Sequence, residues 1–135
     1  MTLIVENKVL KSFCNSLSKT EFITVDTEFL RDKTYWPRLC LIQIGGPGQE
    51  AAIDVLAEGL DLTPILALMR KPDLLKVFHA PRQDFEIFYR LMGELPFPVI
   101  DTQISAMVCG FGDSVGYETL VSKLIKKKID KSMRF

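Results

Sequence analysis

The stretch Phe22-Ile-Thr-Val-Asp-Thr-Glu-Phe29 decides the fold of this 135-residue chain. It is rich in β-branched and aromatic residues, so it is predicted to form a strand. Side chains alternate between the two faces of a strand, so Asp26 and Glu28 share one face with Thr24. Two unpaired carboxylates on one face of a central strand repel each other and lose hydration. A divalent cation removes both costs, so the pair is a candidate metal site.

Working outward from this strand, the sequence predicts an antiparallel meander followed by α/β units. Two further strands, over 39–44 and 51–55, follow the first through connections too short for crossover helices, and Gly45-Gly-Pro-Gly48 is a strong turn signal between them. Periodicity predicts helices over 7–18, 62–69, 82–92, 102–109 and 117–127, and strands over 74–78 and 99–100. The fold class is therefore α/β, a mixed sheet flanked by helices, built as one domain over 1–135.

Asp84 is the third candidate acid. In the helix predicted over 82–92 the apolar side chains form one arc, and Asp84 projects from near its middle, whereas Glu86 faces solvent. A carboxylate inside a buried stripe is costly unless it is paired or bound to a metal. Capping of backbone N–H groups after Pro81 is the alternative, and it stays open. Together with the strand acids, Asp84 could hold two Mg²⁺ or Mn²⁺ ions about 4 Å apart for phosphodiester hydrolysis.

Composition places the chain among ordinary globular domains. Equal numbers of basic and acidic residues give a net charge of zero, which argues against broad, non-specific duplex binding. A net charge of zero is compatible with binding a few nucleotides of a single-stranded end. No apolar run is long enough to span a bilayer and no secretory leader is visible, so we expect a cytoplasmic protein without membrane contact. No phosphate-loop or dinucleotide-binding glycine motif follows any strand.

Several stretches resemble the ribonuclease D family in the right order. Val25-Asp-Thr-Glu-Phe-Leu-Arg31, followed by Tyr35-Trp-Pro-Arg-Leu-Cys-Leu-Ile-Gln-Ile44, is similar to the first exonuclease motif of that family and its next strand. His79-Ala-Pro-Arg-Gln-Asp-Phe-Glu-Ile-Phe88 is similar to the second motif. Asp101-Thr-Gln103 and the helix that begins Gly116-Tyr-Glu-Thr-Leu-Val121 match later landmarks. The resemblance covers nearly the whole chain.

The resemblance implies a ribonuclease H-like fold within the DEDD exonuclease superfamily. It implies a metal-dependent 3′–5′ exoribonuclease that acts on single-stranded RNA 3′ ends, with tRNA precursors among its substrates. Asp26, Glu28 and Asp84 would then be both metal ligands and catalytic residues, working by a two-metal mechanism with Mg²⁺ or Mn²⁺.

The third motif of that family is not found in this sequence. Family members supply a fourth carboxylate from Tyr-x-x-x-Asp, and the residues four positions after Tyr35, Tyr89 and Tyr117 are not aspartate. We therefore expect a C-terminally incomplete exonuclease domain, truncated before this motif, with weak activity or none by itself. The alternative is a non-catalytic or degenerate nucleic-acid-binding module that keeps the exonuclease fold. A truncated sheet domain exposes apolar surface, so self-association is also expected.

Four further residues are candidates for substrate contact. Phe29 could stack on the terminal base or belong to the core. Gln43 is a weaker candidate on the neighbouring strand. His79, the only histidine, is a candidate at a strand end, although a packed or supporting role is the favoured interpretation. Lys131 belongs to a basic C-terminal run that either contacts phosphates or forms a solvated helix end.

Overall fold

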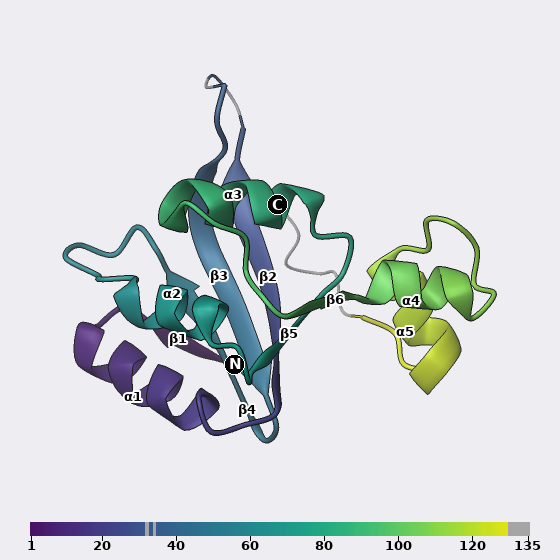
Figure 1. Ribbon diagram of the computed structural model, residues 1–135, viewed down its shortest axis with the longest axis horizontal. Coiled ribbons are helices and arrows are strands. Elements are labelled where there is room, and N and C mark those ends of the chain that lie inside the picture. Colours follow the sequence, from purple (N-terminus) through teal and green to yellow (C-terminus); the bar gives the residue numbers. More distant parts are fainter. Residues whose placement is uncertain (32, 34, 130–135) are drawn as a thin grey trace.

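The computed structural model describes residues 1–31, 33 and 35–129. In this described part, strands form one six-stranded sheet in the order β1-β4-β3-β2-β5-β6 (Figure 1). The strands are β1 (Thr2–Ile4), β2 (Phe22–Leu30), β3 (Arg38–Gly46), β4 (Gln49–Asp54), β5 (Leu75–Phe78) and β6 (Val99–Asp101). The helices are α1 (Asn7–Leu17), α2 (Thr63–Arg70), α3 (Arg82–Met92), α4 (Thr102–Val108) and α5 (Tyr117–Ile125).

The sheet topology confirms the predicted fold class. β2, β3 and β4 form an antiparallel meander, and β5 and β6 then add in parallel on the other side of β2. The short loops between the first three strands permit only antiparallel pairing, whereas α2 and α3 supply the crossovers that parallel pairing requires. β2 is therefore a central strand, with β3 on one side and β5 on the other.

The structure also corrects the prediction in three places. Thr2–Ile4 forms a parallel edge strand against β4, and so short a segment carries too little alternation to be recognised in the sequence. Gly45 and Gly46 belong to β3, so the turn itself is only Pro47–Gly48. A side chain at Gly46 would place its Cβ 2.6 Å from Leu17, so glycine there lets α1 approach the sheet. The last helix ends at Ile125, two residues before its predicted end.

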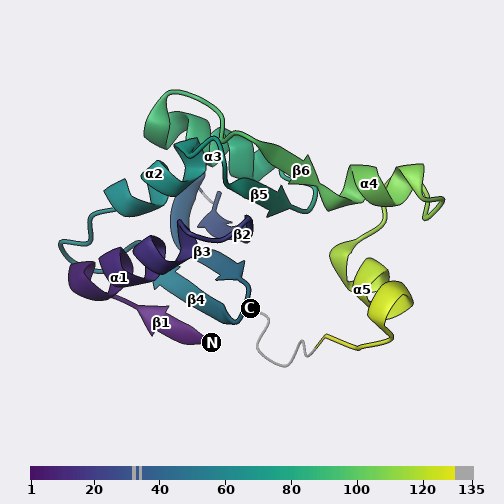
Figure 2. The ribbon, with the colours of Figure 1, turned by 60° about the horizontal axis from the view of Figure 1, so that its bottom comes forward.

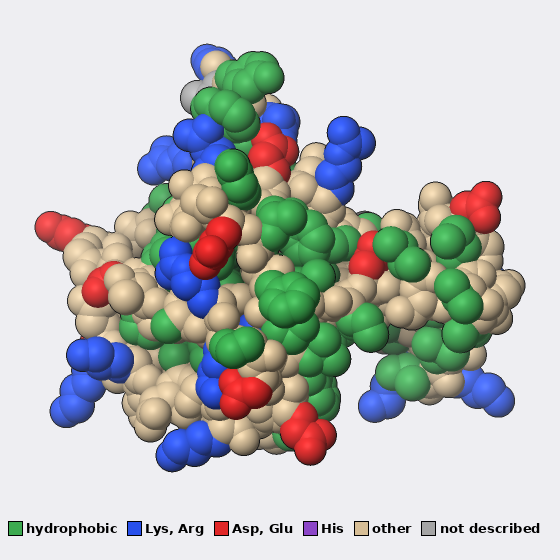
Figure 3. Space-filling model, viewed as in Figure 1, with side chains coloured by type: hydrophobic (Ala, Val, Ile, Leu, Met, Phe, Trp, Pro, Cys, Tyr) green, Lys and Arg blue, Asp and Glu red, His purple; other side chains and the backbone are tan. Residues whose placement is uncertain are grey.

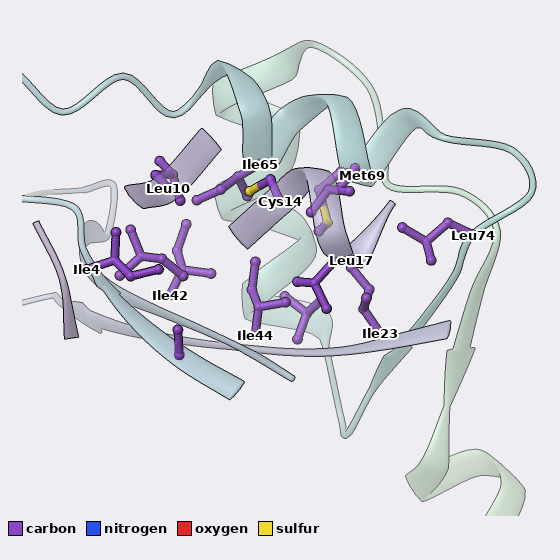
Figure 4. Packing of buried hydrophobic residues seen from close by; sticks show 14 of the residues in the cluster. Ile4, Leu10, Cys14, Leu17, Ile23, Ile42, Ile44, Ile65, Met69 and Leu74 are labelled. Atoms are coloured by element: carbon purple, nitrogen blue, oxygen red, sulfur yellow. The ribbon is translucent and has the colours of Figure 1, made fainter. Parts of the chain in front are cut away.

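The main core lies between one face of the sheet and helices α1, α2 and α3. Figures 1 and 2 show these three helices on the same side of the sheet. Ile23 and Val25 from β2 and Ile42 and Ile44 from β3 point into this layer and are buried. They meet apolar residues of α1 and α2, as Figure 4 shows, including Leu10, Cys14, Leu17, Ile65 and Met69. The opposite face of β2 and β3 is left for polar side chains.

Helices α4 and α5 stand apart from this core, to one side of the sheet (Figures 1 and 2). They close a small apolar cluster of their own around Ala106, Val115 and Leu120. Asp101 joins them to the sheet, since its carboxylate accepts hydrogen bonds from the backbone N–H of Gln103 at 2.8 Å and of Ala80 at 3.0 Å. Asp101 is thereby the N-cap of α4. No helix in the described part of the chain is long and apolar enough to cross a membrane.

Aromatic packing fixes α3 on the sheet. Phe78 at the end of β5 makes edge contacts with two rings of α3, with centroid distances of 5.2 Å to Phe85 and 6.3 Å to Phe88. Phe88 is fully buried. Since α3 also carries Asp84, this cluster sets the position of a candidate site residue.

We expect Phe88→Ala to lower the free energy of unfolding by about 3–5 kcal/mol, because it removes a buried ring and leaves a cavity. Tyr89→Ala, a truncation of the neighbouring exposed ring, is the matched control and should change stability by less than about 0.5 kcal/mol. Urea unfolding followed by circular dichroism measures both. Equal unfolding midpoints for the two variants would contradict this account of how α3 is held.

Lys76 is a fully buried lysine in β5. Its ammonium donates hydrogen bonds to the backbone carbonyls of Lys71 at 2.5 Å and Phe97 at 2.8 Å. These contacts tie the loops before β5 and β6 together. Burial lowers the pKa of Lys76 to about 8, against the opposing charge of Asp73.

This buried lysine predicts a pH dependence of stability. Between about pH 8 and pH 10.5 the unfolded chain keeps a proton on Lys76 that the folded chain has released. Stability due to this group therefore rises with pH across that window. In Lys76→Met this contribution should disappear, which can be measured as the difference between the two proteins' urea midpoints from pH 7.5 to 10. Parallel pH profiles would refute it.

Candidate active site

The two strand acids lie on the open face of the sheet, as the alternation predicts. Thr24, Asp26 and Glu28 are exposed along β2, whereas the residues between them are buried. Asp26 pairs in register with Gln43 of β3, so the amide side chain of Gln43 lies beside the first carboxylate on this face. Sheet pairing thus brings Asp26 and one candidate substrate contact together.

Asp84 approaches the same strand from the helix side. Along β2, only Phe22–Thr24 pair with β5. The rest of this edge of β2 is therefore open to the first turn of α3. There the Thr27 hydroxyl donates a hydrogen bond to Asp84 Oδ1. Asp84 is only 7% exposed, and no side chain caps α3. The carboxylate is therefore held by a strand hydroxyl within the first turn, where the helix dipole also favours negative charge.

The electrostatics of the acids follow from this crowding. Loss of hydration raises the pKa of Asp26, and the charge of Glu28 raises it further; the Thr27 backbone N–H and His79 oppose the rise. Burial also raises the pKa of Asp84, as does the charge of Asp26, against the hydrogen bond from Thr27. Carboxylates whose ionisation is disfavoured by burial and by a neighbouring negative charge are chemically suited to a divalent cation, because its charge relieves both effects.

His79 is held by partners within the protein at both ring nitrogens. Nε2 lies 2.9 Å from the carbonyl oxygen of Val115, and Nδ1 lies 2.8 Å from the hydroxyl of Thr102. A carbonyl only accepts, so Nε2 carries the proton. The ring also makes an edge contact with Tyr117, with centroids 5.7 Å apart. This arrangement agrees with the packed, supporting interpretation, and it connects the end of β5 to the α4–α5 unit.

A concavity of 540 Å³ opens on this face of the sheet. Its lining brings together Asp26, Gln43 and His79 with Thr24 and Tyr117. The walls come from β2, β3, β5, α4 and α5, so segments far apart in sequence create it. A space of this size can admit a nucleotide-sized group beside Asp26.

Glu28, Phe29 and Asp84 are not among the residues that line this space. Phe29 is half-buried, just past a register shift in the β2–β3 pairing, and it is not among the described residues packed against the main core. Within the described ranges, no three His, Cys, Asp or Glu side chains are gathered closely enough to hold a metal by themselves. Lys131 lies outside the described residues.

Thr27 is the site residue that sequence reasoning missed. It lies between the two acids but points to the buried face, where it is 6% exposed. A polar side chain on an otherwise apolar strand face needs a partner. That requirement was readable from the alternation of β2, but the identity of the partner, Asp84, depends on where α3 begins.

Comparison with known proteins identifies the class of protein. A family model described as 3′-5′ exonuclease matches residues 1–135, the whole chain. Ribonuclease D of Acidiphilium cryptum is 54% identical over 133 residues, which cover 98% of this chain and 34% of that protein. Ribonuclease D of Granulibacter bethesdensis is 52% identical over 134 residues, or 99% of this chain and 34% of that one.

Solved structures agree with this. The crystal structure of Escherichia coli RNase D, described as an exoribonuclease involved in structured RNA processing, superposes with a TM-score of 0.90 at 39% identity and covers 97% of this chain and 35% of that one. Brucella melitensis NrnC with bound Mg²⁺ has a TM-score of 0.73 at 25% identity, over 98% of this chain and 66% of that one. The chain belongs to the ribonuclease D family of 3′–5′ exonucleases. It spans about a third of the length of the ribonuclease D relatives.

The link between Thr27 and Asp84 is testable by a matched pair of substitutions. Thr27→Val should lower the free energy of unfolding by about 1–3 kcal/mol, because it leaves a buried carboxylate oxygen without its donor. Thr24→Val makes the same change on the exposed face of β2 and should have little effect. Urea unfolding compares the two. A larger loss for Thr24→Val would contradict the role assigned to Thr27.

Proposed function

We propose that this chain carries the first three acidic ligands of a metal-dependent 3′–5′ exoribonuclease. The observation that carries the proposal is the placement of Asp26 and Glu28 on the open face of a central strand that Asp84 also reaches. Family membership supplies the reaction class, and the acids supply hard oxygen donors of the kind that Mg²⁺ and Mn²⁺ prefer.

Each acid would have a distinct part in holding the metal. Asp26 and Glu28 offer carboxylates on the solvent side of the strand. Asp84 has one oxygen bonded to Thr27, which restricts its rotation. Bound ions would supply an activated water and neutralise the charge that develops on the leaving 3′ oxygen. Burial and a neighbouring negative charge raise the pKa values of Asp26 and Asp84, so metal binding should lower both.

The other candidates would position the nucleic acid. Gln43, beside Asp26, offers amide donors and an acceptor to a ribose or base. Phe29, half-buried beyond Glu28, would stack on the terminal base. His79 would act through its contacts with Thr102 and Val115, keeping the wall of the concavity in place rather than reaching the substrate.

The substrate we propose is the 3′ end of single-stranded RNA, including tRNA precursors. The ribonuclease D relatives and Escherichia coli RNase D, an exoribonuclease involved in structured RNA processing, support RNA over DNA. The NrnC structure with Mg²⁺ supports the choice of metal. The sequence lacks Tyr-x-x-x-Asp, so we propose that the domain is incomplete without this third motif and that the 135-residue chain has feeble activity. Self-association and a cytoplasmic location stay predictions.

The decisive experiment follows nucleotide release from single-stranded RNA labelled at its 3′ end, with Mg²⁺ or Mn²⁺ present. Any metal-dependent trimming should fall to background in Asp26→Asn, because a ligand is lost. Asp113→Asn, at an exposed aspartate of the α4–α5 loop, is the matched control and should retain it. Calorimetric titration with Mn²⁺ on the same proteins measures the site independently of turnover.

The outcomes separate the proposal from its alternative. Trimming lost only in Asp26→Asn would establish the exonuclease. No trimming, with Mn²⁺ binding lost in Asp26→Asn, would mean a real but incomplete site. No metal binding by the unmodified chain would remove Asp26, Glu28 and Asp84 as ligands here and favour a nucleic-acid-binding module without catalysis.

A further inference from the structure

A groove separate from the acidic concavity runs along the outer side of α3. It encloses 690 Å³ and is lined chiefly by Trp36, Arg82, Glu86, Tyr89 and Arg90. Trp36 comes from the hairpin that connects β2 and β3, and the other four come from α3. We call this surface the Trp36 groove. No part of the proposed catalytic site uses these side chains.

Aromatic rings in the groove are accessible to solvent although neighbouring side chains contact them. The Arg90 guanidinium lies 4.0 Å from the Trp36 ring centroid, a cation–π contact that holds both side chains. Trp36 is nevertheless 44% exposed and Tyr89 57% exposed. Tyr35, which contacts Trp36 edge-on, is 82% exposed. Such rings are the platforms on which unpaired bases stack, whatever their sequence.

The charge of the groove is positive even though the chain is neutral overall. Its acid, Glu86, is already paired with Arg31 at 3.0 Å. Arg82 and Arg90 make no ion pair with any described residue. Lys and Arg side chains also surround the projecting β2–β3 hairpin in Figure 3. Guanidinium groups beside exposed rings match a phosphate backbone with unstacked bases better than they match an apolar peptide.

The groove is formed by α3 and the β2–β3 hairpin, and β2 and α3 also carry the candidate acids. Arg31 follows the last residue of β2 and lies three positions after Glu28, which is about 10 Å of extended chain. That length corresponds to about three stacked nucleotides. α3 likewise turns Asp84 toward β2 and presents Arg82, Glu86 and Arg90 on its outer side. A strand whose 3′ end is at the acids could therefore reach the groove a few nucleotides upstream.

We propose that the Trp36 groove binds single-stranded RNA upstream of the 3′ end, with Trp36 and Tyr89 stacking on bases and Arg82 and Arg90 contacting phosphates. The inference rests on the proposed exonuclease function for its direction along the strand. It adds a second, metal-independent contact that would favour long substrates over short ones.

Trp36 is the single tryptophan of the chain, so its fluorescence reports on this groove alone. The test adds unstructured single-stranded RNA of about 12 nucleotides, or of about three, to the 135-residue chain in EDTA, which removes metal-mediated binding. Anisotropy of labelled RNA gives the affinity, and Trp36 fluorescence gives the location. We expect the long RNA to bind and to quench Trp36, and the short one to do neither at the same concentrations.

Substitutions then separate the groove from general charge. The double variant Arg82→Gln with Arg90→Gln should weaken binding of the long RNA by roughly tenfold. It should also flatten the dependence of log K on log salt by about 1.4, since each phosphate contact contributes about 0.7. Lys8→Gln with Lys11→Gln removes the same charge from exposed positions of α1 and should change neither quantity. Replacing both arginines by lysine should restore part of the affinity.

Three results would overturn the inference: no binding of long RNA, binding without quenching of Trp36, or equal weakening in the α1 control. None of them bears on Mn²⁺ binding at Asp26, which is measured separately. Failure of the groove and failure of the catalytic proposal are thus distinguishable.

Discussion

The structure depends on one constraint, the alternation of side chains along a central strand. In β2, Ile23, Val25 and Thr27 must face the helices, so Asp26 and Glu28 must face the opposite side. A slip of one residue would bury both carboxylates in the apolar layer. The burial that stabilises the sheet therefore also fixes where the acidic site can be, because one register of β2 sets both the buried and the exposed side chains.

Thr27 links that register to the rest of the site. Its hydroxyl lies on the buried face and binds Asp84, so α3 is joined to β2 by a polar contact as well as by the rings of Phe78, Phe85 and Phe88. Two residues farther along the helix, on its outer side, Glu86 pairs with Arg31. α3 thus presents an acid toward β2 and arginines toward solvent, which places the acidic site and the Trp36 groove on the two sides of one helix.

The open face of the sheet is where the family's chemistry would take place. Asp26, Gln43 and His79 line one concavity, while α4 and α5 stand at its side and contribute Thr102 and Tyr117 to the wall. The chain spans about a third of the length of its ribonuclease D relatives. The raised pKa values of Asp26 and Asp84 are what uncompensated carboxylates in such a place should have.

The resemblance of the chain's motifs indicated the family, and the sequence by itself determined the strand alternation, the antiparallel meander and the helix that carries Asp84. These features depend on local periodicity and short connections, which the chain encodes residue by residue. It did not determine the edge strand Thr2–Ile4, the Thr27–Asp84 contact, the partners of His79 or the pairing of Trp36 with Arg90. Each of these joins residues separated by tens of positions, so only the packing of α3, α4 and the β2–β3 hairpin around the sheet could decide them.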